Sequence, residues 1–238
     1  MTSEVWTAAL GLGFALGLRH ALDPDHVVAV STIVSESRSI RRSSLVGTSW
    51  GLGHTAALLA AGGAVIGLKL SIPRHAALWM ESAVAGMLVL LGLKAVRTAF
   101  RGWRVHRHVH VHDGREHAHF HAHREGELAH SHRHLLGFRT QPFLVGLVHG
   151  LAGSAGLMIL VLGTIPSVIA GLAYIAMFGL GSTGGMLLMS SLISLPFVWT
   201  AGRFRLFTQG LQLLVGLGSI GFGCFLAWQY GFQHLLPR

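Results

Sequence analysis

The chain has 238 residues, of which 51% are hydrophobic and 11% charged, with a formal net charge of +9. Soluble globular domains carry about 25% charged residues, so this composition excludes an ordinary soluble enzyme and favours a polytopic membrane protein. The positive charge does not predict a nucleic-acid partner, because much of it flanks apolar stretches or lies in one short insert. With Cys224 as the single cysteine, disulfides within the chain and cysteine-based zinc sites are excluded.

Six apolar stretches follow one another along the chain, three before and three after a polar insert. A membrane-spanning helix needs about 20 predominantly apolar residues, and each stretch is long enough for one span. We therefore expect an all-α, polytopic membrane helix bundle of about six transmembrane helices. The expected organisation is a first three-span half (1–100), a cytoplasmic His-rich loop (101–139) and a second three-span half (140–238). The stretches cover residues 5–34, 43–72, 76–99, 142–165, 167–200 and 206–232.

The first and fifth stretches each contain an interruption that predicts a broken helix. Residues 19–26 introduce five ionisable side chains and Pro24 into the first stretch. A proline removes a backbone donor and clashes with the preceding turn, so the helix should kink or open there. The fifth stretch is interrupted by the glycine-rich sequence of residues 181–185. We expect helices 1 and 5 of the bundle to be broken at these two places.

An internal repeat relates the two halves. The sequence GLRHAL at 17–22 matches GLVHGL at 146–151 as Gly-Leu-x-His-small-Leu, and each copy lies in the first span of its half. Since each half holds an odd number of spans, equivalent halves would cross the membrane in opposite senses. Inverted repeats of this kind are typical of secondary transporters, which bind substrate near the midplane on broken helices. Chance similarity in a Gly/Leu-rich chain is the alternative.

The charges of the loops predict the orientation. With six spans, arginines gather on one side, whereas the other offers little beyond Lys69, Arg74 and Arg238. The positive-inside rule therefore places the insert in the cytoplasm and both termini outside. The arginines that carry this prediction are Arg38, Arg41, Arg42, Arg101, Arg104, Arg107, Arg203 and Arg205.

The interruption of the first span is the strongest candidate site. A carboxylate at membrane depth costs about 2.5–3.5 kcal/mol on insertion scales, so Asp23 and Asp25 need partners or water. A surface loop between two short spans is the alternative, but the residues after it are too few to cross again. Opening of the helix would let both carboxylates converge with His20 and His26. Imidazole and carboxylate ligands without thiolate suit Ni, Co, Zn or Mn.

Further polar side chains within the apolar stretches are candidates for a metal path. His54 and His149 are flanked by glycine in apolar surroundings. Polar groups in a membrane usually face the protein interior, although a structural role is an even alternative for a lone histidine. Ser154, Ser182 and Thr183 offer hydroxyl groups to the same path, and helix packing is their alternative role.

The insert is rich in histidine. Two runs alternate as H-x-H-x-H-x-H, and no apolar set is present to build a core, so we expect disorder without metal. The composition indicates metal binding, for buffering, sensing or handover, with a solvated linker as the alternative. The histidines are His106, His108, His110, His112, His117, His119, His121, His123, His130, His132 and His134.

Two motifs carry a resemblance to a known family. The segment His20–His26 matches the H-x4-D-H signature of the nickel/cobalt transporter family, and residues 52–55 resemble its L-G-H-[ST] motif. Residues 178–185 resemble a degraded form of its D-T-x-D-G motif, and residues 150–154 stand where members are more acidic. The chain is shorter than the eight-span members and resembles the six-span branch of urease-accessory nickel permeases.

The resemblance implies an integral protein of a prokaryotic inner or plasma membrane that transports Ni²⁺ or Co²⁺. The metal would be a substrate, and no prosthetic group is implied. The expected partners are the divalent ion, the lipid bilayer, and a cytoplasmic metallochaperone or urease or hydrogenase maturation proteins.

The expected function is Ni²⁺ uptake through the broken first helix. The preferred ligands are His20, Asp25 and His26, with Asp23 and His54 as additional ligands. Efflux by the same fold is the alternative, because relatives with His-rich loops include exporters. An intramembrane metalloenzyme is a remoter alternative, although no H-E-x-x-H motif or recognisable nucleophile is present, so an enzyme is not expected. A haem-binding subunit that uses His54 and His149 is another.

Overall fold

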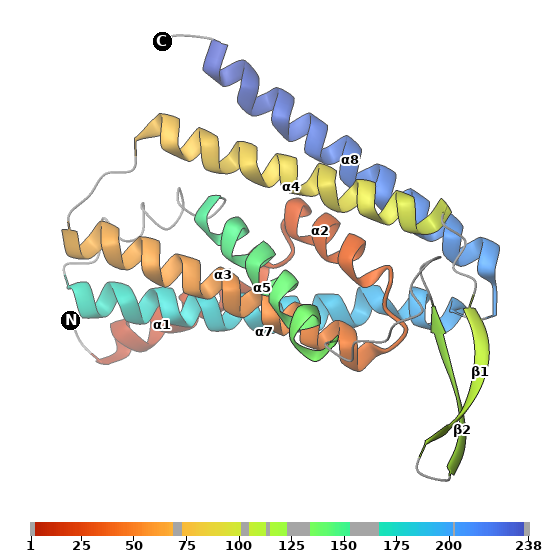
Figure 1. Cartoon of the computed structure of the whole chain (residues 1–238). Coiled ribbons are helices and arrows are strands. Elements are labelled where there is room, and N and C mark those ends of the chain that lie inside the picture. The colour runs from red at the N-terminus through yellow and green to blue at the C-terminus, as the bar shows by residue number, and fades with distance from the viewer. Residues whose placement is uncertain are drawn as a thin grey trace.

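The computed structural model describes residues 3–68, 73–100, 105–112, 115–122, 134–152, 167–201 and 203–235. Helices make up most of this part of the chain, and Figure 1 shows them packed side by side. The helices are α1 (Ser3–His20), α2 (Pro24–Val34), α3 (Ile40–Leu68), α4 (Arg74–Phe100), α5 (His134–Ala152), α7 (Val168–Thr200) and α8 (Arg205–Leu235). The strands are β1 (Val105–His112) and β2 (Arg115–Ala122).

The prediction of a polytopic membrane helix bundle is confirmed. Four helices among the described residues, α3, α4, α7 and α8, are long and apolar enough to cross a bilayer. The helices α1 and α5, with 18 and 19 residues, are shorter. The count of six spans therefore stays a prediction.

The first apolar stretch is broken where the sequence predicts. Helix α1 ends at His20, and the N–H groups of Leu22 and Asp23 form a turn by donating to the carbonyls of Arg19 (2.9 Å) and His20 (3.0 Å). Asp23 then has the extended conformation of an N-cap, and Pro24 is the first residue of α2. Proline suits a first helical position because its missing N–H has no partner there in any case.

The predicted break in the fifth stretch is wrong. Helix α7 runs without interruption through its glycine-rich segment. A side chain at Gly181 would collide with the main chain of α1 at Phe14, and one at Gly185 would collide with Ala21. These glycines therefore let two helices approach closely, as small residues do in membranes, and the helix stays intact. A continuous helix also satisfies its own backbone groups, which no water would reach inside a bilayer.

The insert also differs from the expectation of disorder, and the described chain is not wholly α-helical. Strands β1 and β2 pair antiparallel, in a register that places His106 opposite His121 and His108 opposite His119. The alternating histidines repeat with a period of two, which is the period of a strand. Figure 1 shows the hairpin extending away from the helices, near the end of α4. His123, His130 and His132 lie outside the described residues.

The packing of the helices follows a two-fold pattern. Helix α1 packs on α7 and α5 packs on α3, while α3 also packs on α7 and α4 packs on α8. Exchanging α1 with α5, α3 with α7 and α4 with α8 leaves this set of pairs unchanged. The two halves of the chain are thus arranged as structural equivalents.

Individual contacts obey the same exchange. Gly53 of α3 lies against the main chain of α5 at Phe143, and Gly181 of α7 lies against the main chain of α1 at Phe14. The surrounding sequences are WGLGHT at 50–55 and FGLGST at 178–183. A second repeat thus accompanies the one predicted from sequence, and it puts a serine in α7 where α3 has a histidine.

The equivalent halves run in opposite senses. Gly51 of α3 lies against Thr183 of α7, and reciprocally Gly179 of α7 lies against Thr55 of α3. The two threonine hydroxyls are 3.2 Å apart at the centre of this crossing. Residue numbers rise along α3 as they fall along α7, so the helices are antiparallel. This geometry is that of an inverted repeat.

Candidate metal site

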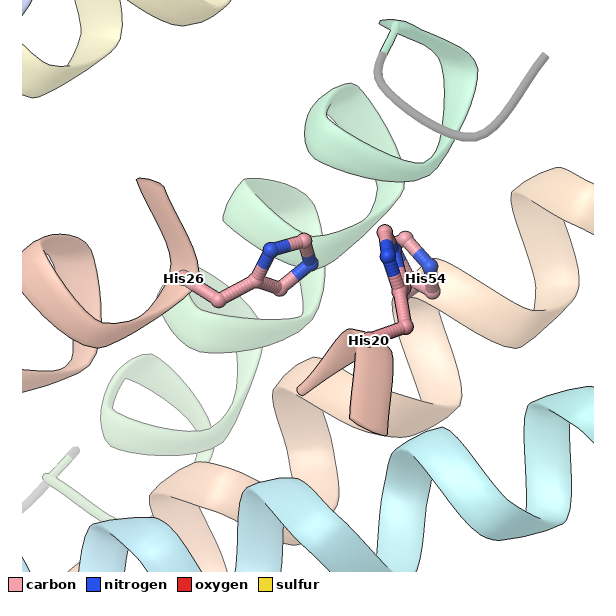
Figure 2. Close-up of side chains that lie close together, drawn as sticks. All are labelled: His20, His26 and His54. Carbon is pink, nitrogen blue, oxygen red and sulfur yellow. The ribbon is translucent and has the colours of Figure 1, made fainter. Parts of the chain in front are cut away.

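Four histidines from four helices gather at the break between α1 and α2. His20 ends α1, His26 lies in the first turn of α2, His54 lies in the middle of α3, and His149 lies near the end of α5. His20 is 8% exposed and the other three are 0% exposed. Figure 2 shows the ring of His26 facing those of His20 and His54.

Three of these rings are close enough to share an ion. One ligand nitrogen from each of His20, His26 and His54 lies within 4.8 Å of the others. The ring centroids are 4.5 Å apart for His20 and His26, and 5.4 Å apart for His26 and His54. Metal–imidazole bonds of about 2.1 Å would place two such nitrogens no more than about 4.2 Å apart. A small inward movement of the rings would therefore suffice for coordination.

Carboxylates orient three of the four rings. Asp23 Oδ2 lies 2.7 Å from Nδ1 of His20, and Asp25 Oδ1 lies 3.1 Å from Nδ1 of His26. The second oxygen of Asp25, Oδ2, lies 2.8 Å from Nε2 of His149. A histidine that donates one N–H to a carboxylate presents its other nitrogen as a lone-pair donor, which is the usual arrangement of metal-binding histidines.

The remaining ring nitrogens are buried without a hydrogen-bond partner among the described residues. They are Nε2 of His20 and His26, both ring nitrogens of His54, and Nδ1 of His149. Buried polar atoms are normally paired, and each unsatisfied one costs about 1–3 kcal/mol. Because a neutral imidazole has a single lone pair, each of the four rings offers one donor nitrogen, and such a set suits a transition-metal cation.

A second group of candidate ligands adjoins the first. Ligand atoms of Asp25, His26 and His149 also lie within 4.8 Å of one another, and Asp25 is only partly buried. His26 thus belongs to both groups. Asp23, predicted as a ligand, belongs to neither; its side chain is 47% exposed and contacts His20.

The three hydroxyl candidates have different environments. Ser182 is fully buried, and its Oγ has no hydrogen-bond partner in the part of the chain that the structure describes. It occupies the position in α7 that His54 occupies in α3. Thr183 contacts Thr55 across the helix crossing, which is a packing role. Ser154 lies outside the described residues.

Sequence reasoning missed two aromatic side chains, Trp50 and Phe178, that contact the histidine cluster. The fully buried indole of Trp50 stacks on His26, with centroids 6.1 Å apart and planes at 21°. The ring of Phe178 lies 5.3 Å from that of His20. Trp50 and Phe178 open the two copies of the second repeat, so a comparison of residues 50–55 with 178–183 would have paired them.

The geometry argues against a haem held by His54 and His149. Their ring centroids are 6.3 Å apart, but the ring of His26 is 4.1 Å from His149 and 5.4 Å from His54. A porphyrin between two axial ligands would have to occupy the space of that ring.

A buried histidine cluster at a helix break inside an inverted-repeat membrane bundle defines the class: an integral membrane transport protein. Residues 6–232 match the family described as "High-affinity nickel-transport protein". The chain belongs to this family.

Similar proteins come from a bacterium and a plant. The chain is 35% identical to the "Urease accessory protein UreH" of Bacillus sp. (strain TB-90), over 93% of this chain and 91% of that protein. It is 30% identical to the "Chloroplast protein FOR GROWTH AND FERTILITY 2" of Arabidopsis thaliana, over 78% of this chain and 46% of that protein. It is 27% identical to the "Chloroplast protein FOR GROWTH AND FERTILITY 1" of Arabidopsis thaliana, over 92% of this chain and 58% of that protein. No solved structure matches the chain.

Proposed function

We propose that this protein carries Ni²⁺, with Co²⁺ as a second substrate, into a prokaryotic cell through the histidine cluster between α1 and α2. The observation that carries the proposal is the group of His20, His26 and His54, buried at the break between α1 and α2 with ligand nitrogens within 4.8 Å. Membership of a nickel-transport family supports the choice of metal.

The donor set fits this substrate. Imidazole nitrogens and one carboxylate, without thiolate, suit borderline divalent cations rather than Ca²⁺ or Mg²⁺, which prefer oxygen ligands. The Asp25 carboxylate offsets part of the charge of a dication inside the membrane. Similarity to a urease accessory protein supports urease maturation proteins as cytoplasmic recipients of the metal.

The membrane potential is a sufficient driving force for uptake. Moving two charges through 100 mV releases about 4.6 kcal/mol, from about 2.3 kcal/mol for each charge. The sequence has no G-x-x-x-x-G-K-[ST] phosphate loop. Uptake in this proposal is therefore independent of ATP.

Reconstituted vesicles with an inside-negative potential provide the test. Purified protein should accumulate labelled Ni²⁺, Co²⁺ should compete, and His26→Ala should abolish accumulation. His75→Ala is the matched control, because His75 is exposed at the start of α4 and belongs to neither group of candidate ligands. Normal nickel accumulation by His26→Ala would show that the site is wrong.

Efflux through the same site is the second candidate, favoured by the histidine-rich hairpin between the halves. Deleting residues 106–134 and comparing the nickel tolerance of cells with their nickel content distinguishes the two directions. Reduced tolerance together with raised content would favour export, whereas reduced content would favour uptake.

A further inference from the structure

The ring of His26 lies between two groups of candidate ligands. Its Nδ1 faces Asp25, whose other oxygen is bound to His149. Its Nε2 is buried and has no hydrogen-bond partner among the described residues. The rings of His20 and His54 lie 4.5 and 5.4 Å away, centroid to centroid. His26 thus shares one group with the Asp25 carboxylate and the His149 imidazole, and the other group with the imidazoles of His20 and His54.

The inverted repeat supplies one equivalent histidine to each group. His20 occupies the fourth position of GLRHAL in α1, and His149 occupies the fourth position of GLVHGL in α5. Helices α1 and α5 exchange under the two-fold pattern of packing. The first group therefore contains the histidine of one half, and the second group contains its counterpart from the other half.

We propose that the ion occupies two overlapping subsites in succession and passes between them by ligand exchange around His26. The first subsite is His20, His26 and His54, and the second is Asp25, His26 and His149. The proposal rests on the proposed function, because it takes the cluster to be the transport site. Since His26 is common to both subsites, the cluster holds one ion at a time.

The two subsites differ in charge. Three neutral imidazoles leave both charges of a dication uncompensated, whereas the Asp25 carboxylate offsets one of them. Burying an uncompensated charge is unfavourable, so the second subsite should hold the ion more tightly. Trp50 flanks this path, because its ring lies 6.1 Å from His26 and 5.8 Å from His149.

Single variants of the full-length protein test this arrangement. Every sample carries serine in place of the eleven loop histidines, so that Ni²⁺ binding reports on the cluster alone. The variants are His54→Ala, which removes one ligand of the first subsite, and His149→Ala, which removes one of the second. His26→Ala removes the shared ligand, and His75→Ala is the control. Calorimetry gives the number of Ni²⁺ ions bound, X-ray absorption gives the ligand types, and vesicles give the uptake rate.

The expected result separates binding from transport. His54→Ala and His149→Ala should each still bind one Ni²⁺ ion, which also shows that they are folded, while uptake falls about tenfold or more. Nickel in His54→Ala should have a carboxylate oxygen ligand that is absent from nickel in His149→Ala. His26→Ala should bind none. His149→Asn should reproduce the His149→Ala result.

Two outcomes would overturn the proposal. Uptake by His149→Ala at the rate of His75→Ala would remove the second subsite, and complete loss of Ni²⁺ binding in His149→Ala would indicate one undivided site. The proposed function fails separately: normal binding and uptake by His26→Ala would exclude the whole cluster. Loss of both in His26→Ala with normal uptake by His149→Ala would contradict only the two-subsite inference.

Discussion

The Nε2 atom of His149 lies 2.8 Å from Oδ2 of Asp25, and this contact joins the two halves of the chain. The residues are 124 positions apart in sequence. The other oxygen of Asp25 contacts His26, so one carboxylate connects the helix break of the first half with the repeated histidine of the second. Asp25 therefore links the two halves as well as being a candidate ligand.

Asp25→Asn should reduce nickel uptake more than any other change of an acidic residue outside the insert. The amide preserves the size of the side chain but removes the negative charge, and it replaces one of the two oxygens that face His26 and His149 by an NH2 group, which donates. Loss of a carboxylate that orients metal-binding histidines typically costs about 10–100-fold in affinity or activity. Initial uptake rates in vesicles at subsaturating Ni²⁺ measure the effect.

Glu4→Gln is the control for Asp25→Asn, since Glu4 is an exposed carboxylate near the start of α1. It should transport at the rate of the unchanged protein. Equal rates for Asp25→Asn and Glu4→Gln would contradict a role for Asp25 in the site.

Asp23→Ala should weaken nickel binding without abolishing it. Asp23 is outside both ligand groups, but its contact with Nδ1 of His20 directs the other nitrogen of that ring toward the cluster. We expect about a tenfold fall in affinity by calorimetry, since the side chain is half exposed and water can replace the carboxylate. A complete loss of binding, equal to that of His26→Ala, would instead identify Asp23 as a direct ligand.

The break in the first helix could be predicted because its causes are local. Pro24 cannot continue the hydrogen bonds of α1, and the ionisable residues beside it are too costly to leave facing lipid. The H-x4-D-H motif is likewise local, so His20, Asp25 and His26 could be recognised as candidate ligands from the sequence. The glycine-flanked, apolar surroundings of His54 make it a candidate ligand, and its ring lies 5.2 Å from that of His20 and 5.4 Å from that of His26.

What could not be predicted depends on residues far apart in the chain. The glycine-rich sequence of α7 is compatible both with a broken helix and with a continuous helix that packs closely on a neighbour. Only the contact of Gly181 with the main chain of α1 shows that the second structure forms. The contact of His149 with Asp25 has the same long-range origin. The hairpin was missed because the alternating histidines were interpreted by composition and not by period.

Gly53→Ala and Gly181→Ala should destabilise the folded protein by similar amounts, because their environments are equivalent under the repeat. At each position a methyl group would collide with the main chain of a neighbouring helix, and overpacking of this kind costs about 1–3 kcal/mol. Thermal unfolding in detergent should show lowered midpoints for both. Gly184→Ala is the control, since among the described residues no atom outside its own stretch of α7 lies within 4 Å of an added methyl group. A large effect at only one of the two positions would contradict the equivalence.

Replacing all eleven loop histidines by serine should impair uptake only at low nickel concentrations. The cluster between α1 and α2 is unchanged by the substitution, so the maximal rate should stay within about twofold, whereas loss of a metal-gathering segment should raise the half-saturating concentration. Uptake measured over a range of Ni²⁺ concentrations separates these quantities. A reduced maximal rate with an unchanged half-saturating concentration would assign the loop to a step after binding.

The insert should face the cytoplasm, and the connection between α3 and α4 should face the outside. Single cysteines introduced as Gly114→Cys and Ser71→Cys test this orientation in a Cys224→Ala background, which removes the native thiol. The positive-inside rule predicts that a membrane-impermeant maleimide labels Ser71→Cys in intact cells, whereas Gly114→Cys is labelled only after permeabilisation. The reverse pattern would invert the topology. The insert would then face the outside of the cell. Because the membrane potential drives cations toward the cytoplasm, uptake would then have to begin on the side of the histidine-rich hairpin.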